Sequence, residues 1–137
     1  MTDVFLDTGY VVALSSEKDD HHQKACELAK QTSQERVQVV TTQDVLVEIG
    51  NALASTKTRS FAAKYINAIE RAATFEVVEA TGELFHRGIE LYEKRQDKAW
   101  GLTDCMSFTV MRDRGIRDAL AHDRDFEQAG FNALLRE

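Results

Sequence analysis

The sequence predicts an α/β fold in three layers, with helices on both faces of a mainly parallel central sheet of about four to five strands. Two observations lead to this expectation. Short apolar runs of strand-forming residues recur along the chain, and helical segments long enough for crossovers separate them. The chain has 137 residues, of which 43% are hydrophobic and 29% charged, as expected for one compact domain over residues 1–137.

Five short segments are expected to form the strands. The first contains Val4, Phe5 and Leu6 in succession, which is typical of a buried strand. The expected strands are Asp3–Leu6, Val37–Val40, Phe75–Val78, Asp118–His122 and Asn132–Leu135.

The segments between the strands carry apolar residues three or four positions apart, which predicts helices. After Asp7 the chain is expected to turn at Gly9 and to begin a short helix near Val11. The other helices are expected at about His21–Ser33, Gln43–Thr56, Ser60–Ala73, Glu83–Asp97 and Leu102–Arg114, with a short turn or helix over Phe126–Gly130.

Polar residues and one glycine mark the expected helix ends. Asp19 or Asp20, Thr42 and Thr103 are placed to cap the starts of the helices that follow them. Gly115 is placed to end the helix that begins near Leu102, because glycine tolerates the left-handed backbone conformation common at that position.

The composition argues against several classes of protein. The chain has no basic segment followed by an apolar one at its start and no apolar run of the roughly 20 residues that span a bilayer, so we expect no secretory signal and no membrane segment. Two cysteines, Cys26 and Cys105, are too few for a disulfide framework, and we expect a cytoplasmic protein. A net charge of −6 argues against non-specific coating of nucleic acid, but it does not exclude a nuclease that binds divalent cations.

Acidic residues from distant segments are the candidate functional residues. Asp7 follows the first strand, Glu48 interrupts an apolar helical turn, Asp104 lies in the first turn of a helix, and Asp123, with Asp125 beside it, follows a later strand. Ligands of open α/β sheets bind beyond the carboxyl ends of the strands, where these acids could meet. Each acid also has an ordinary explanation as a turn residue, a surface residue, a partner of the helix dipole or part of a polar loop.

Carboxylates that converge repel one another. Two unit charges about 4 Å apart repel by roughly 4 kcal/mol at an effective dielectric constant of 20. A divalent cation reverses the sign of this interaction, and oxygen ligands favour hard ions such as Mg²⁺ and Mn²⁺. We therefore expect Asp7, Glu48, Asp104 and Asp123 to converge and to hold a divalent metal.

The segments around these acids resemble those of the PIN-domain ribonucleases, and in particular of the VapC-type toxins of toxin–antitoxin pairs. They follow one another in the order of the family and cover nearly the whole chain. The segments are Phe5–Thr8, Val47–Leu53, Leu102–Asp104 and His122–Phe126. Thr8 and Thr103 match hydroxyls that the family places beside the first and third acids, whereas Ala121 stands where the family often has threonine or serine.

The resemblance implies a PIN-like fold and a metal-dependent endoribonuclease. Its catalytic residues would be Asp7, Glu48, Asp104 and Asp123, and the same four with Asp125 would bind Mg²⁺ or Mn²⁺. The resemblance also implies an RNA substrate, a cognate antitoxin and a homodimer. Two alternatives stay open at this point: an RNA-processing nuclease outside a toxin system, and a catalytically inactive binding module with the same fold.

Other chemistries find less support in the sequence. A receiver or phosphatase domain would need a second acid close to Asp7, and the neighbouring residues supply none. His22 and Cys26 have the spacing of a helical zinc-ligand pair but no evident further ligands. Cys105 lacks a histidine partner that would make it a nucleophile. Lys57, Arg59 and Arg124 lie near the candidate acids and could guide RNA, although each is also explained as an ordinary surface charge.

Overall fold

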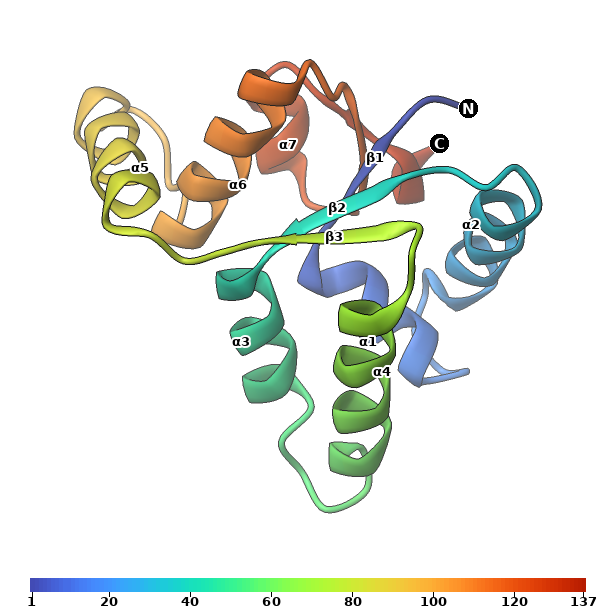
Figure 1. Ribbon diagram of the computed structural model, residues 1–137. Helices are drawn as coiled ribbons and strands as arrows, with labels where there is room; N and C mark the ends of the chain where they lie inside the picture. The colour runs from blue at the N-terminus through green and yellow to red at the C-terminus, as the bar shows by residue number, and fades with distance from the viewer.

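A computed structural model describes residues 1–137, and its centre is one five-stranded sheet in which every neighbouring pair of strands is parallel. The strand order is β3-β2-β1-β4-β5, so the first strand of the chain lies in the middle (Figure 1). The strands are β1 (Val4–Leu6), β2 (Val39–Thr42), β3 (Phe75–Val78), β4 (Asp118–Leu120) and β5 (Asn132–Ala133).

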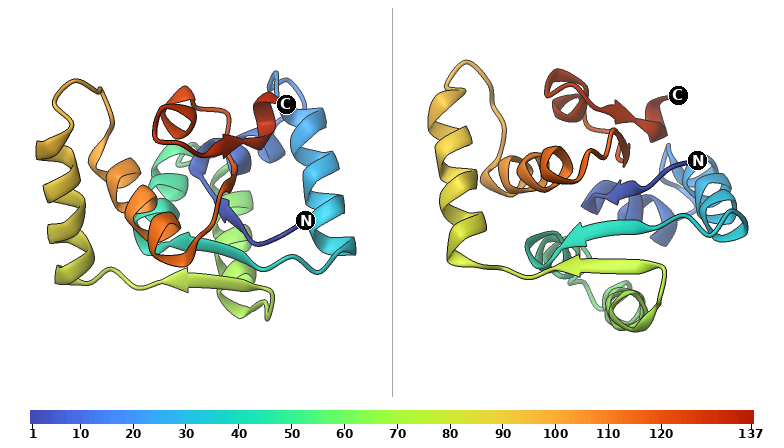
Figure 2. Two further views of the ribbon diagram at one scale, coloured as in Figure 1. Left: turned by 90° about the horizontal axis from the view of Figure 1, so that it is seen from above. Right: turned by 45° about the horizontal axis from the view of Figure 1, so that its top comes forward.

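Helices cover both faces of this sheet, as the sequence predicts. Figures 1 and 2 show α1, α3 and α4 on one face and α6 and α7 on the other, with α5 outside α6. The helices are α1 (Thr8–Ser15), α2 (His22–Gln34), α3 (Gln43–Ala52), α4 (Arg59–Arg71), α5 (Gly82–Lys94), α6 (Leu102–Arg114) and α7 (Arg124–Gln128), and a 3₁₀ turn covers Leu134–Arg136. None of them is long and apolar enough to cross a membrane. The assignment of residues 1–137 to a single domain stays a prediction.

The strand order reverses its direction between β1 and β4. From β1 the chain moves outward through β2 to β3 and then returns past β1 to β4 and β5. Because parallel crossovers are right-handed, the two directions of travel place their helices on opposite faces. The carboxyl ends of β1 and β4 therefore flank the crevice in which open α/β sheets bind their ligands.

The core is continuous across β1 and α6. Val4, Phe5 and Leu6 are fully buried. On the α6 side, the ring of Phe108 packs edge-on against Phe126, with the ring centres 5.0 Å apart, and against Trp100 at 5.1 Å. Aromatic contacts of this geometry hold α6, and with it the segment around residue 104, in a fixed position over the sheet.

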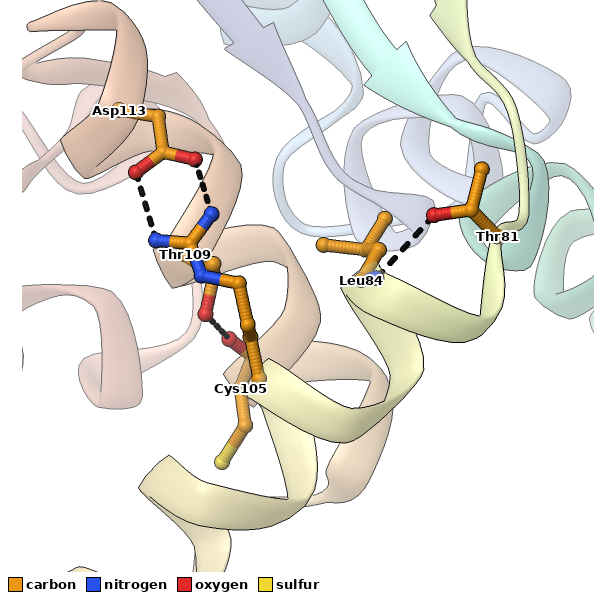
Figure 3. A network of polar contacts seen from close by, with 6 residues as sticks. Thr81, Leu84, Cys105, Thr109 and Asp113 are labelled. Carbon is orange, nitrogen blue, oxygen red and sulfur yellow. Dashed lines mark hydrogen bonds and ion pairs between the residues drawn. The ribbon is translucent and has the colours of Figure 1, made fainter.

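The helices α5 and α6 pack closely, and Figure 3 shows the polar contacts at this packing. A side chain at Gly88 would place its Cβ 2.5 Å from Met106 Cγ, so the close approach depends on glycine. Arg87 on α5 donates to Asp113 on α6, with Nη2 and Oδ1 2.8 Å apart. Thr81 caps α5 by accepting from the Leu84 amide at 3.1 Å.

The second strand lies two residues later than the predicted Val37–Val40, because two threonines belong to it. Thr41 and Thr42 are fully buried, and Thr41 Oγ1 donates a hydrogen bond of 2.8 Å to the backbone oxygen of Leu6 on β1. A β-branched threonine with a buried acceptor serves a strand as well as valine does. Thr42 also caps α3 as predicted, by accepting from the Val45 amide at 3.1 Å.

One predicted helix start and two predicted helix caps are wrong. α1 begins at Thr8, not near Val11, because Asp7 already has the extended backbone of a cap residue. α6 begins at Leu102 as predicted, but its cap is the extended Gly101, and Thr103 lies inside the first turn. The predicted cap at Asp19 or Asp20 is wrong as well: His21 is the cap residue of α2 and makes no side-chain capping bond. Asp19 Oδ1 instead accepts from the His21 amide at 2.8 Å, in the turn before the helix.

Several predicted element ends are also wrong by a few residues. α3, α4 and α5 end at Ala52, Arg71 and Lys94, earlier than predicted. At the first of these ends, the Thr58 hydroxyl satisfies the Leu53 carbonyl at 2.9 Å, which replaces continued helix. β4 and β5 are each two residues shorter than predicted, and α7 begins and ends two residues earlier than the predicted turn. The end of α6 is confirmed, because Gly115 adopts the left-handed conformation with φ of 65°.

Candidate active site

Asp7 lies at the carboxyl end of β1, in the middle of the crevice. Its amide donates to the Leu120 oxygen at 3.2 Å, which ties this point of the chain to the end of β4. Its side chain makes no capping bond to α1 and no ion pair, and the residue is only 8% exposed. Burial, followed by the nearby charge of Asp104, raises the pKa of Asp7 to about 7 from an ordinary 3.8, against a smaller lowering by a backbone hydrogen bond from Thr8.

Glu48 reaches the same region from α3. The residue is half-buried, and its Oε1 accepts a 2.7 Å hydrogen bond from the Thr8 hydroxyl at the start of α1. This bond joins the segments that follow β1 and β2 and fixes the direction of the carboxylate. The charge of Glu48 contributes to the raised pKa values of Asp7 and Asp104, as expected for a carboxylate near both.

Asp104 is the third residue of α6, on the opposite face of the sheet. Its Oδ2 accepts from the Gly101 amide at 3.3 Å, so the carboxylate satisfies a free amide at the helix start. Burial is the largest influence on this group, followed by the charges of Asp123 and Glu48, and together they raise the pKa of Asp104 to about 6. The bond from Gly101 opposes this rise.

Asp123 and Asp125 both turn towards Asp104. One oxygen from each of these three carboxylates lies within 4.8 Å of the other two. Asp123 is the cap of α7, and its Oδ1 accepts from the Asp125 amide at 2.9 Å. Asp123 is exposed and Asp125 half-buried, and burial together with the charge of Asp123 raises the pKa of Asp125.

The structure thus brings the five predicted acids to one end of the sheet, in two parts. Asp104, Asp123 and Asp125 form the tight group, whereas Asp7 and Glu48 lie outside its 4.8 Å limit but within range of its charges. No lysine, arginine or histidine forms an ion pair with any of the five. An all-oxygen donor set without a cationic partner, one member of it buried, fits a hard divalent cation.

The other candidates are not part of this group. His22 Nε2 lies 3.5 Å from Cys26 Sγ, but its Nδ1 lies 2.7 Å from the Ala13 oxygen, and the acids are the only cluster of three potential metal ligands. Burial, followed by the charge of Asp104, raises the pKa of Cys105, so its thiol is a poor nucleophile. Arg59 donates to the Ala54 oxygen at 2.6 Å and thereby closes the end of α3.

Sequence reasoning missed two residues at the rim of the crevice. The imidazole rings of His21 and His122 stack with their centres 4.7 Å apart. A Cβ at Gly9 would lie 2.7 Å from His122 Nε2, so Gly9 leaves the space that the second ring occupies. The position of His122 between a strand and Asp123 was the available signal, since residues at such strand ends face the crevice.

Comparison with known proteins gives a consistent set of matches. A model of the PIN domain matches residues 4–132. The 23S rRNA-specific endonuclease VapC20 of Mycobacterium tuberculosis, from strains CDC 1551 / Oshkosh and ATCC 25618 / H37Rv, is 30% identical over 128 residues, which cover 93% of this chain and 95% of that protein. The crystal structure of M. tuberculosis VapC20, a sarcin–ricin loop cleaving toxin, matches with a TM-score of 0.81 and 29% identity and covers 96% of this chain and 98% of that one.

Proposed function

The chain belongs to the PIN-domain family, and from this premise we propose that it is an endoribonuclease dependent on Mg²⁺ or Mn²⁺. We propose further that it is the toxin of a toxin–antitoxin pair. The observation that carries the nuclease proposal is the meeting of carboxylates from β1, α3, α6 and the start of α7 without a cationic side chain among them.

We assign the catalytic roles to Asp7, Glu48, Asp104 and Asp123, with Asp125 as a further metal ligand. When bound, the divalent cation would lower the pKa of the attacking water and neutralise charge on the phosphate. The chain's own contribution is to hold the carboxylates in place before substrate arrives. Asp7 is held by burial at the end of a central strand.

The supporting hydrogen bonds fix the remaining acids. The Thr8 hydroxyl orients Glu48, and the Gly101 amide orients Asp104. Asp123 is fixed by the bond that it accepts as the cap of α7. Preorganised ligands of this kind lower the reorganisation needed in the reaction.

The proposed reaction is hydrolysis of a phosphodiester. Water adds to phosphorus, the bond to the 3′ oxygen breaks, and that oxygen leaves with a proton. The products are a 3′-hydroxyl and a 5′-phosphate. A 2′,3′-cyclic phosphate would instead require attack by the ribose 2′-hydroxyl without an added water.

The relatives suggest where to look for substrate and partners. VapC20 of M. tuberculosis is specific for 23S rRNA and cleaves the sarcin–ricin loop, and we propose a structured RNA loop of this kind as the first substrate to test. We also propose a cognate antitoxin protein and a homodimer, both expected from the resemblance to VapC-type toxins. The alternatives remain an RNA-processing nuclease outside a toxin system and an inactive binding module.

The test is RNA cleavage by the wild type and by Asp7→Asn. A hairpin with the sarcin–ricin loop of M. tuberculosis 23S rRNA and total RNA serve as substrates, with Mg²⁺, Mn²⁺ or EDTA. We expect cleavage with either ion, none in EDTA, and a loss of at least about 100-fold in Asp7→Asn, as for a group that acts in the transition state. Asp3→Asn, the same change at an exposed site four residues earlier, serves as the control.

Two results would refute the nuclease proposal. One is cleavage in EDTA or by Asp7→Asn at the wild-type rate. The other is products that end in a 2′,3′-cyclic phosphate. Growth arrest on expression of the wild type, but not of Asp7→Asn, separates a toxin from an RNA-processing enzyme. A folded protein that binds no Mg²⁺ or Mn²⁺ in a titration and cleaves no RNA would support the inactive binding module.

A further inference from the structure

A hollow of about 420 Å³ lies between the end of α5, the loop over residues 95–101 and the first turn of α6. Its walls combine aromatic and basic side chains with the start of a helix. Its lining includes Tyr92, Arg95, Lys98, Trp100, Gly101 and Cys105. We refer to this hollow as the α5–α6 pocket. Figure 1 shows the loop by which the chain turns back from α5 into α6, and residues of this loop line the pocket.

The α5–α6 pocket adjoins the acids directly. Gly101 lines it, and the amide of the same glycine donates to Asp104 Oδ2 at 3.3 Å. Cys105, the residue after Asp104, also lines it, and in Figure 3 its sulfur points away from Asp113 and towards the end of α5. An RNA strand that is cleaved at the acids would therefore place a neighbouring nucleotide at this pocket.

The two aromatic side chains of the pocket, Trp100 and Tyr92, differ in their exposure to solvent. Trp100 is buried and donates from Nε1 to Gln128 Oε1 at 3.2 Å, so it forms the fixed back of the pocket. Tyr92 is 50% exposed. Its ring is not part of the buried core, and its hydroxyl makes no hydrogen bond within the protein. An exposed ring beside a phosphodiester-cleaving site is a surface on which an unpaired base can stack.

The cations are held in place before any ligand binds. The Arg95 guanidinium lies over the Trp100 ring, 5.1 Å from its centre, and pairs with both oxygens of Asp97 at 3.0 and 3.1 Å. The Lys98 ammonium lies 4.0 Å from Asp97. Two cations against one carboxylate leave a positive charge next to the acidic crevice, in a chain whose net charge is −6.

We propose that the α5–α6 pocket is a nucleotide subsite, which takes one unpaired base of RNA against Tyr92 and the adjoining phosphate against Lys98 and Arg95. This inference rests on the proposed function, because it places the pocket beside the cut. The volume is that of a small-ligand site. A phosphate near these cations would also draw the RNA backbone towards carboxylates that otherwise repel it.

The first experiment measures binding, so that it does not depend on cleavage. Fluorescence anisotropy of short single-stranded RNA in EDTA is compared for the wild type, Tyr92→Leu and Phe85→Leu. Phe85 is an equally exposed aromatic residue on α5 outside the pocket, at 45% exposure. Loss of a stacked base costs roughly fivefold to 100-fold in Kd, so we expect that rise for Tyr92→Leu and no change for Phe85→Leu.

An abasic nucleotide scanned along the RNA makes this test specific. At one position the missing base should weaken binding by the wild type and by Phe85→Leu, but should cost Tyr92→Leu nothing further, since the two changes remove the same contact. Equal losses in all three proteins would overturn the proposal, as would wild-type affinity in Tyr92→Leu. Thermal unfolding of each variant establishes that the fold is kept.

The second experiment tests the phosphate contact. Lys98→Gln is compared with Lys94→Gln, which makes the same charge change at a lysine outside the pocket. Each phosphate contact to single-stranded RNA contributes about 0.7 to the slope of log Kd against log salt concentration. We expect Lys98→Gln to lower the slope by that amount and Lys94→Gln to leave it unchanged, and equal slopes in the two variants would overturn the contact.

The outcomes separate the two proposals. RNA that binds with the Tyr92 and Lys98 effects but is never cleaved with Mg²⁺ or Mn²⁺ would support the subsite and refute the nuclease. RNA that is cleaved with no effect of either variant would support the nuclease and refute the subsite.

Discussion

Removal of the buried charge at Asp7 should stabilise the metal-free protein at neutral and alkaline pH. The folded state raises the pKa of Asp7 to about 7 from an ordinary 3.8, chiefly by burial and by the charge of Asp104. Between these two pH values the folded protein holds a proton that the unfolded chain releases. The free energy of unfolding therefore falls as the pH rises from about 4 to about 7, and it levels off above that.

The size of this effect follows from the pKa values. A difference of about three pH units, at about 1.4 kcal/mol per unit, corresponds to about 4 kcal/mol of lost stability above pH 7. Asp7→Asn carries no charge at any pH and escapes this loss. Because its amide must still find partners in the buried site, we expect a net gain of about 2–4 kcal/mol at pH 8, or about 6–12 °C in Tm for a chain of this length.

Urea denaturation of both proteins in EDTA at pH 4 and pH 8 measures the effect. At pH 4 we expect Asp7→Asn to be no more stable than the wild type, because its amide needs partners in the buried site at every pH. At pH 8 we expect Asp7→Asn to be the more stable protein, with Asp3→Asn matching the wild type at both pH values. Saturating Mg²⁺ should narrow the gap, since only the wild type retains the full ligand set, and an ion at 100 times its Kd adds about 2.7 kcal/mol. An Asp7→Asn protein less stable than the wild type at pH 8 in EDTA would refute the reasoning.

Two further substitutions test the packing and the support of the site. Gly88→Ala places a methyl group 2.5 Å from Met106 Cγ and should lower the free energy of unfolding by about 1–3 kcal/mol. The control Gly50→Ala, where no atom lies within 4 Å of the added Cβ, should raise the free energy of unfolding by up to about 1 kcal/mol. Equal Tm values for the two variants would contradict this packing. Thr8→Val removes the 2.7 Å bond to Glu48 and should lower kcat for RNA cleavage roughly tenfold to 100-fold with little change in KM. Thr8→Ser keeps the hydroxyl and should stay close to the wild type, and a loss as large as that of Thr8→Val would show that the methyl group, not the bond, matters.

The alternation of strands and helices was predictable because the spacing of apolar residues within each segment indicates it. The apolar run Val4–Leu6 suits only a buried strand, and Gly115 allows the left-handed turn that ends α6. The order of strand and crossover then leaves few topologies, and in the one observed the end of β1 lies at the crevice. The location of Asp7 followed from these facts.

The remaining details depend on partners far away in sequence. Thr41 belongs to the strand because its hydroxyl donates a hydrogen bond to the Leu6 carbonyl. The residues next to Thr41 in the sequence do not reveal this partner. Asp123 caps α7 because the backbone after β4 is extended at this residue, which the neighbouring residues do not determine. The close packing of α5 on α6 depends on the contact of Gly88 with Met106, which neither segment reveals alone.

The most direct measurement is a crystal soaked in Mn²⁺ and measured at the manganese absorption edge. We predict one anomalous peak bounded by the carboxylates of Asp7 and Asp104 and by at least one of Asp123 and Asp125, and its absence from crystals of Asp7→Asn. A crystal with manganese only on surface acids, or with the peak unchanged in Asp7→Asn, would contradict the claim that these side chains together hold the catalytic ion.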